Sequence, residues 1–228
     1  MGEPLLAHTK DQLKAERIYD VLRKRIRDLE LAPGAPLRKE ELAVAFGVSR
    51  APVSEALARL SEEGLVDIFP QHGSFVAKIR AEDVREGLFI RLGLETQAMR
   101  DVALARDPAL LAQLDANIAA QAEALRRDEL TQFYDLDEAL HALIFGAVGR
   151  PRASRFLDSA RAQLDRVRRL ALPGGGRPEA TFDEHRRLVE AIRMGDPEFA
   201  AAAMRAHLVE VTASVERQLA HLAAPEPR

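Results

Sequence analysis

Four side chains in the C-terminal half of the chain are of types that bind metal ions. Asp137 and His141 stand four residues apart, a spacing that places both on one face of a helix. His185 opens the apolar stripe of a second segment, and His207 lies in a strongly apolar turn of a third. Three imidazoles and one carboxylate from three helices could close on one divalent cation. Imidazole suits zinc, nickel, copper or iron, and a single carboxylate does not choose among them.

These residues also have other interpretations. A single histidine is more often a surface or hydrogen-bonded core residue, and an Asp-x-x-x-His spacing alone is weak evidence of a site. If the four residues do hold a metal, a hydrolase that activates water on zinc is one alternative function. Glu138 and Glu184 adjoin the ligands, but no sequence motif marks a general base. A purely structural metal is a further alternative.

The candidate ligands lie in a region, residues 81–228, that is rich in alanine and leucine and has no strand pattern. Its breaks contain proline, glycine or a capping aspartate, which end helices. We expect an antiparallel all-helical bundle, whose interior can hold a ligand or a metal. Four arginines crowd one helix, and most are expected to be solvated: Arg155, Arg161, Arg166 and Arg168. The expected helices lie near 82–105, 108–126, 130–148, 152–171, 179–194 and 197–221.

Residues 1–80 have a different pattern, which predicts a winged helix-turn-helix DNA-binding domain. Apolar residues at steps of three and four predict helices over 11–30, 39–46 and 50–63. Two β-like segments, 65–69 and 74–79, flank a turn and predict a hairpin. The fold class is therefore mainly α, with a winged helix-turn-helix followed by a helical bundle.

The third predicted helix has the position of a recognition helix, whose N-terminal side chains enter the major groove. These side chains are Ser49, Arg50, Ala51 and Ser54. Arg50 could donate two hydrogen bonds to a guanine, and Ser49 could also cap the helix. The wing turn would lie by the DNA backbone or minor groove, with His72 and Gly73.

The N-terminal pattern resembles the GntR family of bacterial regulators. The matching residues include Gly47-Val48-Ser49-Arg50-Ala51-Pro52-Val53, Glu63-Gly64-Leu65-Val66 and Gly73-Ser74-Phe75-Val76. This resemblance implies two-fold homodimers on palindromic double-stranded operator DNA. Many relatives carry arginine where this chain has Glu40 and Ser54, so the usual operator core is not assumed and weaker DNA binding is expected. Arg38 and Lys39 could partly replace the missing charge.

The C-terminal pattern is similar to the FCD ligand domain of the fatty-acid-regulator branch of that family. The matching positions are Asp137-x-x-x-His141, Glu184-His185-Arg186 and Met204-x-x-His207. The resemblance implies a divalent ion on Asp137, His141, His185 and His207, with zinc preferred and nickel, manganese or iron as alternatives. A small organic acid could fill an open metal position. Arg91 would pair with its carboxylate, or alternatively with Glu95 on the helix surface.

The composition restricts the setting of this function. The 228 residues include no cysteine, which excludes disulfides and thiolate metal sites. No apolar run approaches the roughly 20 residues that span a bilayer, so we expect a cytoplasmic protein with no membrane partner. The net charge is −3, so a DNA-binding face must come from local clustering. We expect a non-enzymatic transcription regulator, more often a repressor relieved by its ligand than an activator.

Overall fold

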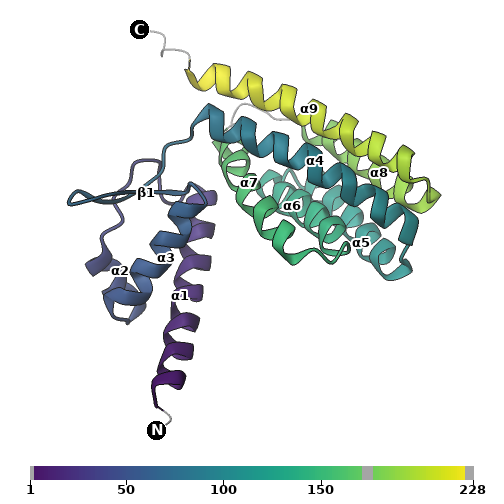
Figure 1. Ribbon diagram of the computed structural model, residues 1–228. Coiled ribbons are helices and arrows are strands. Elements are labelled where there is room, and N and C mark those ends of the chain that lie inside the picture. The colour runs from purple at the N-terminus through teal and green to yellow at the C-terminus, as the bar shows by residue number, and fades with distance from the viewer. Residues whose placement is uncertain (1–2, 171–176, 224–228) are drawn as a thin grey trace. The chain divides into compact units, whose positions relative to one another are not determined.

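The computed structural model describes residues 3–170 and 177–223. The chain forms two compact units, Met1–Asp83 and Val84–Arg228 (Figure 1). No helix among the described residues has the length and apolar character needed to cross a membrane. The expected class, a mainly helical chain with one small hairpin, is confirmed.

The first unit is a winged helix-turn-helix. It contains α1 (Glu3–Arg27), α2 (Lys39–Phe46), α3 (Arg50–Glu62), β1 (Val66–Phe69) and β2 (Gly73–Val76). Helix α1 packs on α3, and its Ile18 and Leu22 share the core with Val53 and Leu57, all at most 1% exposed. Helix α1 ends before the predicted residue 30 because Leu29 has a left-handed backbone, with φ of 61°.

The turn between α2 and α3 follows the prediction in one respect and departs from it in another. Gly47 ends α2 with φ of 64°, a conformation that favours glycine. Ser49 occupies the N-cap position of α3, but its side chain makes no capping hydrogen bond. The predicted cap is therefore wrong. Pro52 stands at the third position of the helix, and it lacks the N–H that a cap hydroxyl often accepts from.

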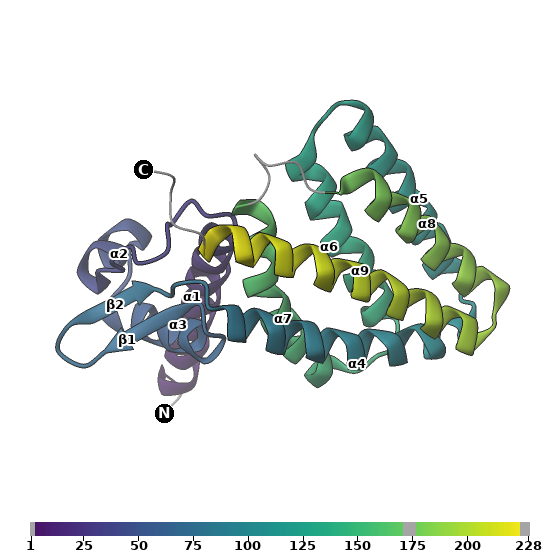
Figure 2. The ribbon, with the colours of Figure 1, turned by 90° about the horizontal axis from the view of Figure 1, so that it is seen from above.

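The wing is an antiparallel hairpin in which Val66 pairs with Val76 and Phe69 with Gly73 (Figure 2). Residues 35–37 pair with the outer edge of β2. Leu37 N–H donates to Ser74 O over 2.8 Å, and Val76 N–H donates to Ala35 O over 2.9 Å. The segment before α2 is thereby fixed against the wing. The backbone of Arg38 therefore has a defined position, because the preceding residue, Leu37, is hydrogen-bonded to the wing.

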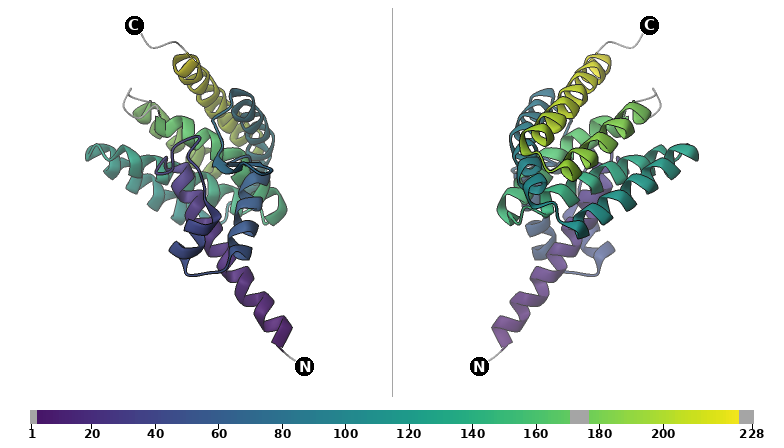
Figure 3. Two further views of the ribbon diagram at one scale, coloured as in Figure 1. Left: turned by 90° about the vertical axis from the view of Figure 1, so that its left-hand side faces the viewer. Right: turned by 90° about the vertical axis from the view of Figure 1, so that its right-hand side faces the viewer.

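The second unit is the predicted helical bundle. Its helices are α4 (Ala81–Ala105), α5 (Pro108–Arg126), α6 (Leu130–Gly146), α7 (Pro151–Leu170), α8 (Pro178–Met194) and α9 (Pro197–Ala223). Helix α5 packs on both α6 and α8, as the end-on views show (Figure 3). Helices α4 and α9 are antiparallel, since Arg85 pairs with Glu216 and Arg100 with Glu198.

The charged helix α7 is buried to a degree that the sequence did not predict. Arg161 and Arg166 are 7% and 0% exposed, and the Arg168 side chain is 10% exposed. The expectation that most of these arginines are solvated is wrong; of the four, Arg155 is exposed. Carboxylates from other helices offset the cost of burial, with Glu95 at 3.0 Å from Arg161 Nη2. Buried charges are retained where such partners are present.

Candidate metal centre and DNA-reading face

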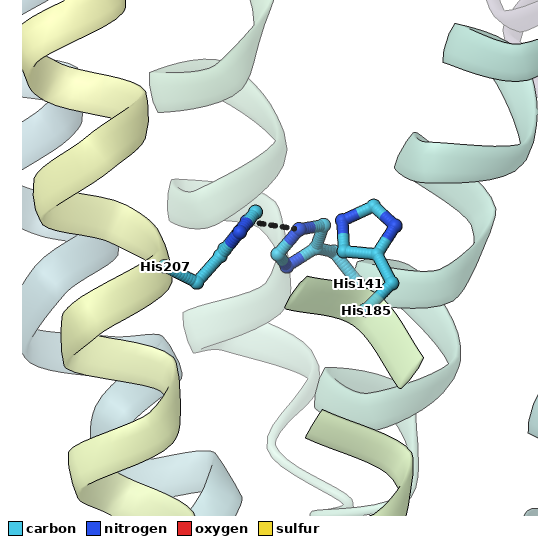
Figure 4. Close-up of side chains that lie close together, drawn as sticks. All are labelled: His141, His185 and His207. Carbon is cyan, nitrogen blue, oxygen red and sulfur yellow. Dashed lines mark hydrogen bonds between the residues drawn. The ribbon is translucent and has the colours of Figure 1, made fainter. Parts of the chain in front are cut away.

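Three imidazole rings meet inside the helical unit. His141 comes from α6, His185 from α8 and His207 from α9, and each is at most 1% exposed. One nitrogen of each ring lies within 4.8 Å of the others, and Figure 4 shows the three rings turned toward one another. The structure therefore brings together three residues that are far apart in sequence and were predicted to form one site.

The outer nitrogen of each ring is held by a different partner. His141 Nδ1 lies 2.5 Å from Glu95 Oε2, and His207 Nδ1 lies 2.8 Å from Glu184 Oε2. His185 Nδ1 lies 2.9 Å from Gln121 Oε1. An imidazole that donates from Nδ1 keeps a lone pair on Nε2, and a metal-binding histidine is commonly oriented in this way by its second nitrogen.

A chain of amides fixes which nitrogen of His185 carries the proton. The Asn117 amide donates to the Leu136 carbonyl over 3.0 Å, so its oxygen is left to accept. It accepts from the Gln121 amide nitrogen over 2.7 Å. The Gln121 oxygen can then only accept, and His185 must donate to it from Nδ1. The Nε2 atom of His185 is consequently the ring nitrogen that faces Asp137 Oδ1 and the other two imidazoles.

Asp137, the fourth predicted ligand, lies beside His185 but outside the group of atoms that are all within 4.8 Å of one another. Its Oδ1 atom lies 3.2 Å from His185 Nε2, while Oδ2 accepts from Arg168 Nη1 over 2.6 Å. Neither Asp137 Oδ1 nor His185 Nε2 has a hydrogen-bond partner among the described residues. A bound cation would satisfy these two buried atoms. His141 Nε2 lies 3.2 Å from His207 Nε2 and 3.5 Å from Arg91 Nη2.

The electrostatic environment keeps these groups in the state that binds metals. Burial lowers the pKa of His141 to about 3 and that of His207 to about 4. Burial alone would raise the pKa of Asp137, but the neighbouring Arg168 holds it well below its usual range. At neutral pH His141 and His207 are therefore neutral and Asp137 is ionised. Metal binding need not displace a proton from any of these three side chains.

Arg91 also lies beside this centre, but not as either sequence interpretation placed it. It is 2% exposed and donates from Nε to Glu95 Oε1 over 2.6 Å. The pair with Glu95 is real, whereas its predicted position on the helix surface is wrong. The Nη2 atom of Arg91 lies 3.5 Å from His141 Nε2. A guanidinium is thus available at the edge of the candidate metal centre.

Sequence reasoning missed the residues that orient the imidazoles. Glu95 was considered only as a surface partner of Arg91, and Glu184 only as a neighbour of His185. Gln121 and Asn117 were not singled out. A signal was present, because two carboxamides stand four residues apart on the buried face of α5. Buried amides need hydrogen-bond partners, so this spacing indicates a polar network inside the bundle.

The candidate DNA-reading residues lie at the N-terminal ends of α2 and α3 and in the wing turn. Most are exposed, while two are half-buried, Lys39 and Ser54; the exposed ones are Arg38, Ser49, Arg50, Ala51, His72 and Gly73. Both arginines of this set, Arg38 and Arg50, form ion pairs with glutamates. Arg38 Nη1 lies 2.8 Å from Glu41 Oε1, and Arg50 Nη1 lies 3.2 Å from Glu40 Oε1.

Comparison with known proteins assigns both units. Residues 14–76 match the family of bacterial regulatory proteins called gntR, and residues 86–210 match the FCD domain. The chain belongs to the GntR family. This GntR protein is 37% identical over 217 residues to an HTH-type transcriptional regulator in an unstable DNA locus of Streptomyces ambofaciens. That alignment covers 95% of this chain and 91% of the relative.

One further relative agrees with this family assignment, and one solved structure has the same fold. The HTH-type transcriptional repressor RspR of Escherichia coli K12 is 35% identical to the GntR protein over 202 residues, or 89% of each chain. The fold matches that of Escherichia coli McbR/YncC with a TM-score of 0.78 at 20% identity, covering 90% of this chain and 98% of that one. The protein is therefore a DNA-binding transcriptional regulator, and no relative supports the hydrolase alternative.

Proposed function

We propose that this GntR protein is a homodimeric repressor whose helical domain holds a divalent metal and releases operator DNA when a small carboxylate binds. The observation that carries the proposal is the meeting of ring nitrogens of His141, His185 and His207 within 4.8 Å, with Asp137 Oδ1 3.2 Å from His185 Nε2. Hydrogen bonds fix the outer nitrogens of the three imidazoles, which leaves the inner ones for a cation. Zinc suits three imidazoles and a carboxylate, and nickel, manganese or iron are alternatives.

The same centre suggests the class of effector. A divalent ion held by the three histidines alone, or one that accepts a fifth ligand beside Asp137, would keep a position for a carboxylate oxygen. Arg91 lies at the edge of this position, with Nη2 3.5 Å from His141 Nε2. A guanidinium pairs strongly with a carboxylate. We therefore propose that Arg91 contacts a small organic acid, while Glu95 holds the guanidinium in place.

The DNA-binding half of the proposal assigns the exposed ends of α2 and α3 to the major groove. Arg50 and Ser54 would lie over base edges, with Ser49 and Ala51 at the start of α3 and with Arg38 and Lys39 nearer the phosphates. His72 and Gly73 would carry the wing to the backbone or minor groove. Two copies would read half-sites about one turn of DNA apart.

Control of DNA binding requires that the effector bind more tightly to the form that cannot grip the operator. The element that joins the two functions along the chain is α4, which begins at Ala81, directly after the wing unit. The same helix carries Arg91 and Glu95. Any change at the metal centre that moves these side chains acts on the helix that follows the DNA-binding unit.

The proposed metal binding is tested by measuring the metal content of the protein. Purified protein is dialysed against a mixture of divalent ions, and the bound metal is counted by elemental analysis. We expect one ion per chain in the wild type and a large loss in His207→Ala. His221→Ala is the matched control, because His221 is exposed. Equal metal content in all three proteins would contradict the site.

The proposed response to the effector is tested by measuring DNA binding through fluorescence anisotropy of a labelled operator duplex. Metal-loaded protein should release the duplex when a small organic acid is added, and chelator-treated protein should not respond. Arg91→Gln should keep its metal yet need more acid. An acid response that is unchanged after chelation would contradict the proposed link between metal and effector.

A further inference from the structure

Val44 is the most exposed large apolar side chain in the part of the chain that the structure describes. It lies in α2 and is 84% exposed, whereas its neighbour Ala43 is buried and faces the core. A β-branched residue favours a helix less than alanine does, so Val44 brings no gain in stability to its helix. Single exposed apolar residues are common on protein surfaces, and the position of Val44 therefore decides what its exposure means.

Val44 belongs to the same helix face as Glu40, because residues four apart in a helix project to one side. Glu40 Oε1 lies 3.2 Å from Arg50 Nη1, in the first turn of α3. The face of α2 that carries Val44 is thus continuous with the start of α3. In a helix-turn-helix domain this end of the second helix of the motif enters the major groove. Val44 consequently adds an apolar group to a charged surface that faces DNA.

The turn between the two helices fixes the backbone around Val44. Gly47 N–H donates to Val44 O over 3.2 Å, and Val48 N–H donates to Ala43 O over 3.0 Å. The side chain is also restricted, since valine has one strongly preferred rotamer in a helix. The two methyl groups of Val44 therefore have a defined position relative to α3, which is what the recognition of a single base requires.

The chemistry of the major groove identifies what these methyl groups would contact. Phosphates and most base edges offer hydrogen-bond acceptors or donors, and the apolar group in the groove is the C5-methyl of thymine. Glu40 and Glu41 precede Val44 in the same helix, and their charge has the same sign as that of the phosphates. A thymine methyl is therefore a better partner for this part of α2 than the DNA backbone.

We propose that Val44 contacts the methyl group of a thymine in each half of the operator, so that α2 as well as α3 reads the DNA sequence. The inference rests on the proposed DNA-reading face and adds to it a residue that distinguishes thymine from the other bases. Removing one methyl group from such a contact weakens binding about fourfold, the value of one small apolar group taken out of water.

The test uses the full-length protein and fluorescence anisotropy with a duplex selected from a random library for tight binding. Each thymine is replaced in turn by uracil, which keeps the base pair and lacks only the methyl group. At one thymine of a half-site, the wild type should bind about fourfold more weakly after the replacement. Val44→Ala, which retains a good helix former, should bind the unmodified duplex more weakly and show no further loss at that thymine.

The control is Val209→Ala, which shortens a 54% exposed valine of α9. This variant should respond as the wild type does at every thymine. If the wild type and Val44→Ala lose the same affinity at every thymine, Val44 reads no methyl group and the inference is overturned. An equal loss of affinity in Val44→Ala on selected and random duplexes would overturn it as well. In that case a change of oligomeric state in analytical ultracentrifugation would assign Val44 to a contact between copies of the chain.

A further variant separates this inference from the proposed reading face. Arg50→Gln should weaken binding to the selected duplex, because Arg50 is the residue proposed to contact a base. If Arg50→Gln binds the selected duplex as the wild type does, the proposed reading face is wrong and the role of Val44 is wrong with it. If Arg50→Gln binds weakly but no thymine depends on Val44, the reading face stands and the thymine contact alone is overturned.

Discussion

Arg50 Nη1 lies 3.2 Å from Glu40 Oε1, which joins the first turn of α3 to the first turn of α2. The two side chains are 71% and 61% exposed, and an ion pair this exposed contributes little to stability. In the proposed DNA-reading face, Arg50 would contact a base or phosphate of the operator. Glu40 would then compete for that guanidinium and repel the DNA.

We therefore predict that Glu40→Gln binds duplex DNA more tightly than the wild type. The variant should behave as though one more phosphate were neutralised, and its plot of log K against log salt should be steeper by about 0.9. The free energy of unfolding should change by less than about 0.5 kcal/mol. Fluorescence anisotropy at several salt concentrations and urea unfolding measure the two quantities.

The control for this prediction is Glu62→Gln, which makes the same change of charge at the other end of α3. That variant should bind DNA as the wild type does. If both variants gain affinity to the same extent, the effect comes from net charge and not from the position of Glu40. If neither gains, the ends of α2 and α3 do not face the duplex.

The helices could be predicted because each carries its own signals. Helix α2 has the predicted bounds, and its end depends on one glycine. The clustering of His141, His185 and His207 could be predicted from residue type, spacing and resemblance. The burial of α7 could not, since Arg161 and Arg168 take their partners from α4 and α6. Local sequence cannot show that a carboxylate more than 30 residues away will stand opposite a buried guanidinium.

Gln121 should control metal affinity without touching the metal. Gln121→Met keeps the size of the side chain but removes the oxygen that accepts from His185 Nδ1 over 2.9 Å. His185 then loses the bond that fixes its proton, and we expect metal affinity to fall 10- to 100-fold. Competition with a fluorescent chelator measures the affinity. Gln113→Met, at an exposed position of the same helix, should leave it unchanged, and a loss as large in this control would refute the role of Gln121.

The metal-free protein should lose stability in mild acid. Burial lowers the pKa of His141 to about 3 and of His207 to about 4, whereas an unfolded histidine titrates near 6.5. Below about pH 6.5 the unfolded chain therefore takes up protons that the folded chain does not. Stability is complete above that pH and falls as the pH approaches 4, by roughly 2 kcal/mol per histidine at pH 5.

Urea unfolding in the presence of a chelator at pH 7 and pH 5 tests this expectation. His207→Gln should show a smaller loss between the two values, since one of the titrating groups is gone. His221→Gln, which changes an exposed histidine, should lose as much as the wild type. An identical loss in the His207 variant would mean that this imidazole is protonated in the folded chain.

Two glycines of α4 should respond in opposite directions to the same substitution. A Cβ atom on Gly87 would overlap the carbonyl oxygen of Ala160 in α7, whereas one on Gly93 would meet nothing within 4 Å. Gly87→Ala should therefore cost about 1–3 kcal/mol through overpacking. Gly93→Ala should stabilise the protein by about 0.5–1 kcal/mol, because alanine favours the helix.

The functional consequence of the Gly87 substitution follows from its place on α4. Arg91 lies one turn further along this helix and Glu95 two turns, and Glu95 holds His141 at 2.5 Å. Pushing α4 away from α7 would move Glu95 relative to His141, so Gly87→Ala should also bind metal more weakly. Urea unfolding and chelator competition on both variants measure the two effects. If Gly87→Ala matches Gly93→Ala in both, α4 does not need its close approach to α7 to position the metal centre.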